Sequence, residues 1–205
     1  MIQISIFQPG KENAMQARDR IKEIISDSIA VKRSFLADVS EVEKVGEAAQ
    51  AIKDCYARGG KLLVFGNGGS AADSQHIAAE MVVRFRRERK ALACISLTAD
   101  TSILTAVSND YDFSKVFLRQ LEAHLRKEDL VIAISTSGVS ANVVDAVKYA
   151  AARKVPVIAL TGKGGGPLAS IADIPIIVPS QVTARIQETH NVLIHAICEL
   201  VEENL

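Results

Sequence analysis

Hydrophobic and polar positions along the chain follow two different periods. Between about residues 12 and 58, apolar residues recur every three or four positions, as on the buried face of a helix. Further along, nearly continuous apolar runs alternate with segments of helical period. These runs cover residues 61–65, 91–97, 130–135, 155–161 and 174–179. Because such runs suit strands that are covered on both faces, they predict the strands of a parallel sheet.

Helices are expected between and around these strands. Their expected ranges are 70–83, 101–107, 113–126 and 140–152, with a short turn after residue 166 and a last helix from about 183 to 203. Five strands separated by helices predict an α/β fold with a doubly wound, five-stranded parallel sheet in one domain, residues 1–205. The N-terminal helical arm (residues 1–58) and the long last helix exceed a minimal sandwich. We therefore expect them to pack on or between copies of the domain.

Three strand ends carry polar or glycine-rich turns: GNGGS at 66–70, STSGVS at 135–140 and TGKGGG at 161–166. In a doubly wound sheet, ligands bind beyond the carboxyl ends of the strands. The convergence of these three turns predicts where the binding site lies.

The second of these turns places four hydroxyl groups around a glycine, where a strand meets a helix. They belong to Ser135, Thr136, Ser137 and Ser140. Backbone N–H groups and the positive end of the helix dipole favour an anion at such a junction. Ser140 alone has a second interpretation as the N-cap of the helix. Four hydroxyls in six residues favour a phosphomonoester site.

The first turn fits the loose dinucleotide pattern G-x-G-x-x-A at residues 66–71. That pattern also requires an acid at the end of the next strand, and Asp100 lies beyond the expected place. No G-x-x-x-x-G-K-[ST] motif occurs. A tight strand-to-helix connection would explain the glycines alone, whereas Asn67 at the helix start favours a contact with a sugar or phosphate.

Candidate acid–base or metal-binding residues follow on two helices. His76 and Glu80 are four residues apart and therefore neighbours on one helix face. Gln187, His190 and His195 lie on an otherwise apolar stretch of the last helix. Histidine moves protons near neutral pH and binds zinc, but such residues are also common as surface contacts or packed core side chains. Spacing alone favours His190, three residues from Gln187, over His195.

Composition excludes several classes of function. The 24 basic and 24 acidic residues balance, which gives no electrostatic footprint for nucleic acid or an anionic membrane. No apolar run is long enough for a membrane span, and the first residues lack a signal-peptide pattern. The three cysteines, Cys55, Cys94 and Cys198, are scattered and indicate buried thiols in a reducing cytoplasm. The basic run at 84–90 is expected to be a solvated loop.

Four segments in this order resemble the sugar isomerase (SIS) domain family, and within it the phosphoheptose isomerases. They are GNGGSAADSQHIAAEMVVRF, VSNDYDF, ISTSGVSANV and RIQETHNVLIHAI, and the resemblance extends from about residue 14 to residue 200. It implies a homotetramer that interconverts sedoheptulose 7-phosphate and D-glycero-D-manno-heptose 7-phosphate for nucleotide-activated heptoses. Only the first dozen residues look additional.

The resemblance also implies roles for individual residues. Glu80 and His195 match the catalytic pair, and the phosphate loop matches the four hydroxyl residues named above. Further substrate contacts match Asn67, Gly68, Gly69, Asn109, Asp110 and Gln187, together with Glu80. In zinc-containing members, one zinc per subunit has ligands that match His76, Glu80, Gln187 and His195.

Two alternatives remain open at this level. Some related SIS tetramers bind the bacterial replication initiator without catalysis, and these lack the glutamate that matches Glu80 here.

The geometry of the implied metal site is also open, because Gln187 and His195 are eight residues apart, about 12 Å of helix rise. Either long side chains converge on one metal, or His195 serves a site shared between subunits.

Overall fold

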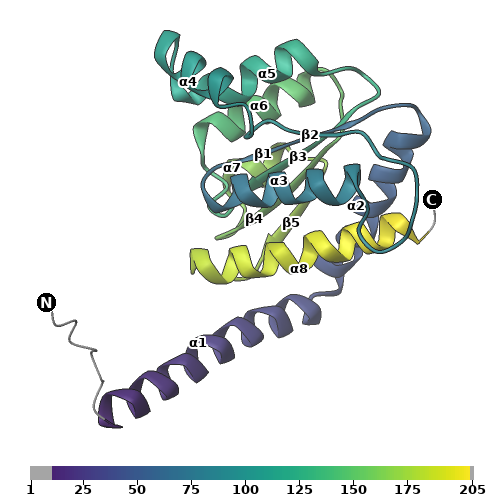
Figure 1. Ribbon diagram of the computed structural model, residues 1–205. Coiled ribbons are helices and arrows are strands. Elements are labelled where there is room, and N and C mark those ends of the chain that lie inside the picture. Colours follow the sequence, from purple (N-terminus) through teal and green to yellow (C-terminus); the bar gives the residue numbers. More distant parts are fainter. Residues whose placement is uncertain (1–10, 204–205) are drawn as a thin grey trace, which may run out of the picture.

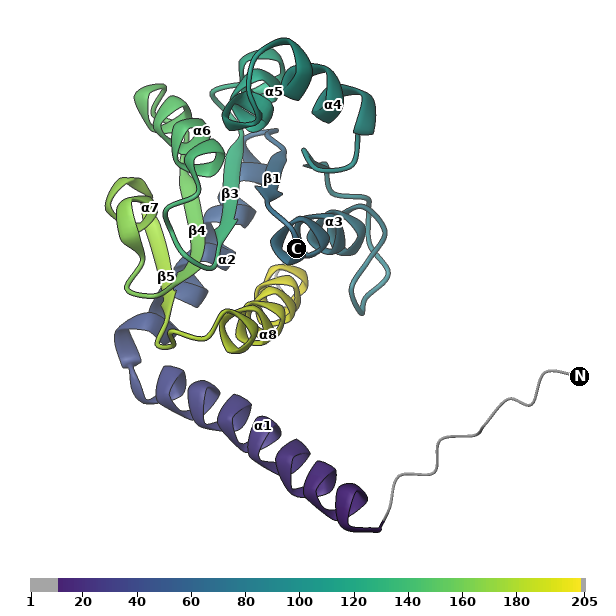
Figure 2. The ribbon, with the colours of Figure 1, turned by 90° about the vertical axis from the view of Figure 1, so that its left-hand side faces the viewer.

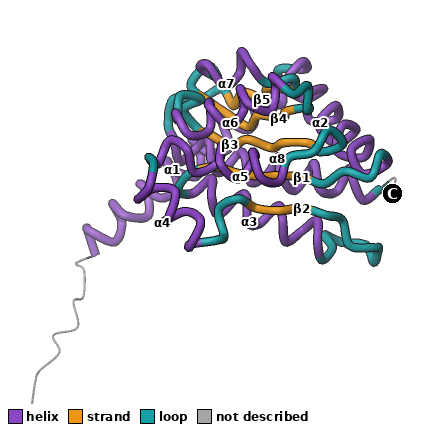
Figure 3. The backbone as a smooth tube through the Cα atoms, turned by 90° about the horizontal axis from the view of Figure 1, so that it is seen from above, coloured by secondary structure: helices purple, strands orange, loops and turns teal. Residues whose placement is uncertain are grey.

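The fold is built around a central sheet of five parallel strands. The computed structural model describes residues 11–203, with side chains from residue 15 onward. The strands are β1 (Leu62–Gly66), β2 (Cys94–Ser96), β3 (Leu130–Ser135), β4 (Val157–Gly162) and β5 (Ile174–Val178). They lie in the order β2-β1-β3-β4-β5 (Figure 3). The predicted doubly wound, five-stranded parallel sheet is confirmed.

Helices cover both faces of this sheet (Figures 1 and 2). They are α1 (Lys11–Ala37), α2 (Val39–Ala57), α3 (Gly69–Val82), α4 (Thr101–Asp110), α5 (Val116–His124), α6 (Ala141–Ala152), α7 (Gly166–Ile171) and α8 (Thr183–Glu202), with a 3₁₀ turn η1 (Phe113–Lys115) before α5. Helices α2, α3 and α8 pack on one face, and α4 to α7 pack on the other.

Alternate residues of the three central strands, β1, β3 and β4, enter one of two apolar cores. In β1, Leu62 and Val64 pack toward α2, α3 and α8, whereas Leu63 and Phe65 pack toward the opposite helices. The Phe65 ring stacks on Phe117 of α5, with ring centroids 4.9 Å apart. Because both faces of these strands are covered, most of their positions are apolar. Each buried side chain of this size contributes about 1.5–3 kcal/mol.

The largest differences from the predicted strands and helices are at two places. The run 91–97 forms only the three-residue edge strand β2, in which Ile95 is exposed. The predicted helix 113–126 is divided into η1 and α5. Asp112 caps η1 by accepting a hydrogen bond from the Ser114 backbone N–H at 2.7 Å. The tighter turn at η1 precedes the start of α5 at Val116.

The expectation that the leading and last helices are all surplus to the sandwich is wrong for α2 and α8. Ala48, Ile52 and Cys55 of α2 are fully buried, and Ile194 of α8 is buried in the same core. These two helices cover one face of the sheet within the chain.

Helix α1 extends away from this body (Figures 1 and 2). It is tied to α8 by hydrogen bonds from the Ser28 hydroxyl to Glu188, at 2.6 Å, and from Arg185 to the Ile24 carbonyl. Its apolar side chains Ile21 and Ile25 are more than half exposed. The first ten residues, part of the additional N-terminal segment, lie outside the described residues.

Candidate active site

The glycine-rich turn and the hydroxyl-bearing loop lie side by side, because β1 and β3 are neighbours in the sheet. The strand order also reverses here, since the crossover from β1 leads to β2 on one side and β3 lies on the other. Doubly wound sheets bind their ligands at such a switch point. The two loops are joined by a reciprocal amide pair between Asn67 and Asn142, with N···O distances of 2.8 and 2.9 Å. Asn142, on the first turn of α6, was not singled out from the sequence.

The hydroxyl-bearing loop gathers its hydroxyl groups at the N-terminal end of α6. Gly138 adopts φ +68°, a conformation that favours glycine, and its backbone N–H donates to the Ser135 hydroxyl at 3.2 Å. Ser140 occupies the N-cap position of α6, yet its side chain makes no capping hydrogen bond. Its hydroxyl lies 3.2 Å from that of Ser135. Thr136 and Ser137 are half-buried beside them. The N-cap interpretation of Ser140 therefore does not account for its hydroxyl.

The glycine-rich turn admits a side chain from α8. Gly68 has φ +56° and serves as the N-cap of α3. A Cβ atom on the next residue, Gly69, would lie 1.9 Å from Nε2 of Gln187. Only a glycine leaves room for Gln187 to lie against the start of α3.

Helices α3 and α8 pack side by side in a constant register. Asn191 donates to the Asp73 carboxylate at 2.9 Å, and His195 faces His76. Partners along the two helices are thus 118 or 119 positions apart in sequence. Burial raises the pKa of Asp73, and its Oδ2 atom has no hydrogen-bond partner within the described part of the chain.

Three of the predicted catalytic or metal-binding residues meet where the second half of α3 faces α8. Nε2 of His76 lies 2.8 Å from Nε2 of His195 and 3.6 Å from Oε1 of Glu80. Because two imidazole nitrogens in hydrogen-bond contact share one hydrogen, one ring donates and the other accepts. The His76 side chain is 40% exposed and that of Glu80 is 20% exposed, so the group is open to a ligand.

His190, which helix spacing favoured, points elsewhere. It is completely buried, and its Nε2 atom lies 3.1 Å from the Thr161 carbonyl oxygen, which can only accept. Burial lowers the pKa of His190 to about 4, with the hydrogen bond to Thr161 acting in the opposite direction. This histidine is a neutral core residue beneath β4.

Gln187, Asn109 and Asp110 are not brought to the His76–Glu80–His195 group. Gln187 lies against Gly69, seven residues before His76 and about 10 Å away along α3. Asn109 donates to Asp110 at 2.8 Å, and both are exposed at the end of α4.

Zinc is compatible with this group by donor type. Two imidazoles and a carboxylate are a common catalytic zinc set, with a fourth position open to substrate. Among the described side chains, no three His, Cys, Asp and Glu groups already converge as the ligands of one metal ion. The 2.8 Å between His76 and His195 is shorter than the roughly 3.3 Å edge of a tetrahedron with bonds of about 2.0 Å. The donor types therefore fit zinc, whereas the two nitrogens would have to move about 0.5 Å farther apart to bind it.

The chain is similar to known proteins over most of its length. The chain matches the SIS domain family over residues 27–162. It is 54% identical to the phosphoheptose isomerase of Citrifermentans bemidjiense over 161 residues, which cover 78% of this chain and 84% of that protein. It is 50% identical to the phosphoheptose isomerase of Aquifex aeolicus over 187 residues, or 90% and 96% of the two chains.

A solved structure is similar over nearly the same range. The phosphoheptose isomerase of Neisseria gonorrhoeae superposes with a TM-score of 0.85 at 44% identity, covering 91% of this chain and 99% of that one. The fold and the switch-point site define a sugar isomerase domain. The chain belongs to the SIS domain family and, within it, to the phosphoheptose isomerases.

Proposed function

We propose that the protein is an aldose–ketose isomerase that converts sedoheptulose 7-phosphate to D-glycero-D-manno-heptose 7-phosphate in the biosynthesis of nucleotide-activated heptoses. The observation that carries this proposal is the meeting of His76, Glu80 and His195 on α3 and α8, where α3 starts in the turn that is joined to the hydroxyl-bearing loop. The close relatives that are phosphoheptose isomerases support the same substrate. The presence of Glu80 argues against a non-catalytic SIS tetramer that binds the replication initiator.

The hydroxyl-bearing loop binds the 7-phosphate in this proposal. Ser135, Thr136, Ser137 and Ser140 supply hydroxyl donors, and α6 directs its first backbone N–H groups at the same place. Asn67, Gly68 and Gly69 line the adjoining turn and contact the sugar. Gln187 would reach the sugar from α8. For Asn109 and Asp110, exposure at the end of α4 leaves their side chains available to substrate.

Glu80 and His195 then move the proton. Isomerisation transfers a proton between C1 and C2 through an enediol, which requires a base and an acid near the two carbons. Glu80 acts as the base, and His195 donates to the substrate oxygen from the ring nitrogen that would not bind zinc. The two side chains come from different helices, and the α3–α8 register sets the distance between them.

We propose one zinc ion per subunit as the cofactor. His76, Glu80 and His195 would hold it, and it would stabilise the developing oxyanion as a Lewis acid. Gln187, the fourth ligand that the family resemblance implies, has its amide against Gly69, about 10 Å along α3 from His76. The fourth position is therefore assigned to the substrate.

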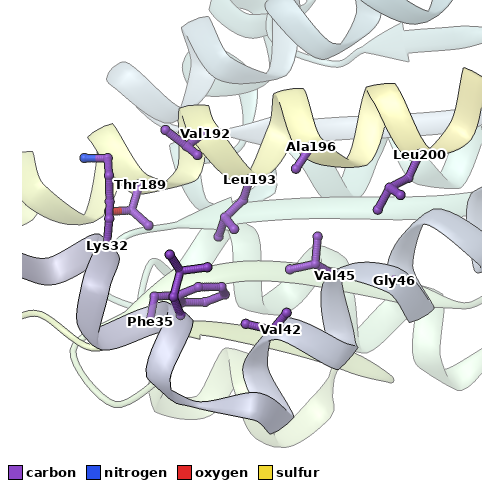
Figure 4. Close-up of a pocket in the computed structure, with 11 residues that line it drawn as sticks. Lys32, Phe35, Val42, Val45, Gly46, Thr189, Val192, Leu193, Ala196 and Leu200 are labelled. Atoms are coloured by element: carbon purple, nitrogen blue, oxygen red, sulfur yellow. The ribbon is translucent and has the colours of Figure 1, made fainter. Parts of the chain in front are cut away.

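A homotetramer is the proposed assembly. An apolar groove of about 480 Å³ lies between the α1–α2 corner and α8 (Figure 4). Phe35, Val42, Val192 and Leu193 are among the residues that line it. Together with the exposed isoleucines of α1, this groove supplies an apolar surface for other subunits. Light scattering should give about four times 22 kDa, and a monomer at micromolar concentration would contradict the assembly.

We also propose that the protein acts in the cytoplasm, without nucleic-acid or membrane partners. Cys55, Cys94 and Cys198 are all free and buried, as expected in a reducing compartment. Within residues 11–203, the structure has no helix that is both long and apolar enough to cross a membrane.

The experiment that tests the function is turnover of sedoheptulose 7-phosphate with and without a chelator. The proposal predicts conversion to the aldose, loss of activity after chelation and recovery with zinc. Absence of turnover by the zinc-loaded protein would refute the isomerase assignment. Activity that is insensitive to complete metal removal would refute the zinc alone.

A further inference from the structure

The segment between α3 and β2, residues 83–93, contains the basic run that the sequence suggested is a solvated loop. This segment passes beside the C-terminal end of α8 (Figure 1). Arg84, Arg86 and Arg87 are exposed as expected, but the Arg89 side chain is only 10% exposed. The solvated interpretation is therefore wrong for Arg89.

The Arg89 guanidinium bonds to both helices that carry the catalytic residues. Toward α3, it donates to the Glu80 and Met81 carbonyl oxygens, each at 2.8 Å. Toward α8, its Nε donates to the Glu202 carboxylate at 3.1 Å. The planar fork of an arginine suits several acceptors at once, which a lysine ammonium does not match.

Glu202 is a fixed partner for this arginine. Its side chain is 3% exposed, and it accepts the backbone N–H groups of Phe85, Arg86 and Arg87 at 2.6 to 2.9 Å. Burial by itself raises the pKa of Glu202, but these N–H groups and the charge of Arg89 outweigh it and lower the pKa to about 2. The carboxylate is thus ionised across the working pH range.

The same loop also contacts the proposed acid. The Phe85 ring packs on the ring of His195, with centroids 5.4 Å apart. Glu202 therefore holds the loop residue that lies against His195, while Arg89 holds the helix turn that carries Glu80.

We propose that Arg89 is a positioning residue of the isomerase site, because its buried guanidinium fixes the end of α3, with Glu80, against the end of α8. This inference rests on the proposed function of Glu80 and His195. Misplacing a reacting group by about 1 Å can reduce turnover about 100-fold. The phosphate-binding loop is at the other end of α3, so substrate binding should not depend on Arg89.

The test compares Arg89→Gln and Arg89→Lys with the matched control Arg86→Gln. Arg86 lies on the same loop and pairs with Glu199 of α8, but both side chains are largely exposed. We expect kcat to fall about 10- to 100-fold in both Arg89 variants, with KM within about twofold of wild type. The control should keep both constants. Rates are measured per folded protein, well below each variant's unfolding temperature.

Arg89→Lys separates positioning from simple charge compensation. Lysine still neutralises Glu202, so a role limited to stability would be rescued in this variant, and a wild-type kcat would overturn the inference. Equal changes in kcat and KM would overturn it too. If Arg89→Gln does not fold, the lysine variant alone decides. Failure of the proposed function would be seen separately, as a wild-type protein without turnover.

Discussion

His190 should make the stability of the fold sensitive to mild acid. This residue is neutral in the folded chain, and burial lowers its pKa from an ordinary value of 6.5 to about 4. Protonating it would place a positive charge on a completely buried ring, where burial disfavours the charged form. The experiment lowers the pH from 8 to 4.5 for the wild type and for His190→Gln. The glutamine keeps an N–H donor for Thr161 but does not titrate.

The sign and size of the effect follow from the two pKa values. Between pH 6.5 and pH 4 the unfolded chain binds a proton at His190 that the folded chain does not, so acid favours unfolding. The contribution is complete above pH 6.5 and is lost progressively below it. The loss is about 2 kcal/mol at pH 5 and approaches about 3 kcal/mol at pH 4.

Urea unfolding at fixed protein concentration measures this loss. The difference in unfolding free energy between wild type and His190→Gln should decrease by about 2 kcal/mol from pH 8 to pH 5. A pH-independent difference would refute the assignment of His190 as a neutral buried core residue.

Other predictions concern the two binding loops. Gly69→Ala should fold but displace Gln187, because its Cβ would lie 1.9 Å from that side chain. It should raise KM as much as Gln187→Ala does, with no further rise in the double variant; additive effects would show that the two residues act independently. Ser137→Ala should weaken substrate binding by about 1–3 kcal/mol, the scale of a lost charge-assisted hydrogen bond, measured as KM or by calorimetry. Unchanged KM for single alanines at all four hydroxyl residues would rule out the phosphate loop.

The sheet and the hydroxyl-bearing loop were predictable because their signals are local. Continuous apolar runs indicated strands covered on both faces, and glycine with clustered hydroxyls marked the turn after β3. The packing of α2 and α8 in the core was not predictable. The sequence of an amphipathic helix shows that one face is apolar, but not whether that face packs on its own sheet or on another subunit. That choice depends on tertiary contacts.

The pairing of helices α3 and α8 also lies beyond local patterns. Spacing within α8 favours His190 beside Gln187, whereas the register between the helices brings His195 to His76 and turns His190 toward β4. Similarly, Arg89 looks like any other residue of the basic run 84–90. Only the position of Glu202, 113 residues later, distinguishes it.

The most direct test of the proposed catalytic pair is a comparison of turnover among Glu80→Gln, His195→Ala and His190→Ala. Glu80→Gln keeps the size of the side chain but removes the basic carboxylate, so turnover should fall by at least about 10²–10⁴-fold while sedoheptulose 7-phosphate still binds. His195→Ala should reduce turnover comparably, and His190→Ala should cost far less once the protein is folded. If His190→Ala abolishes turnover and His195→Ala spares it, the site proposed here is wrong.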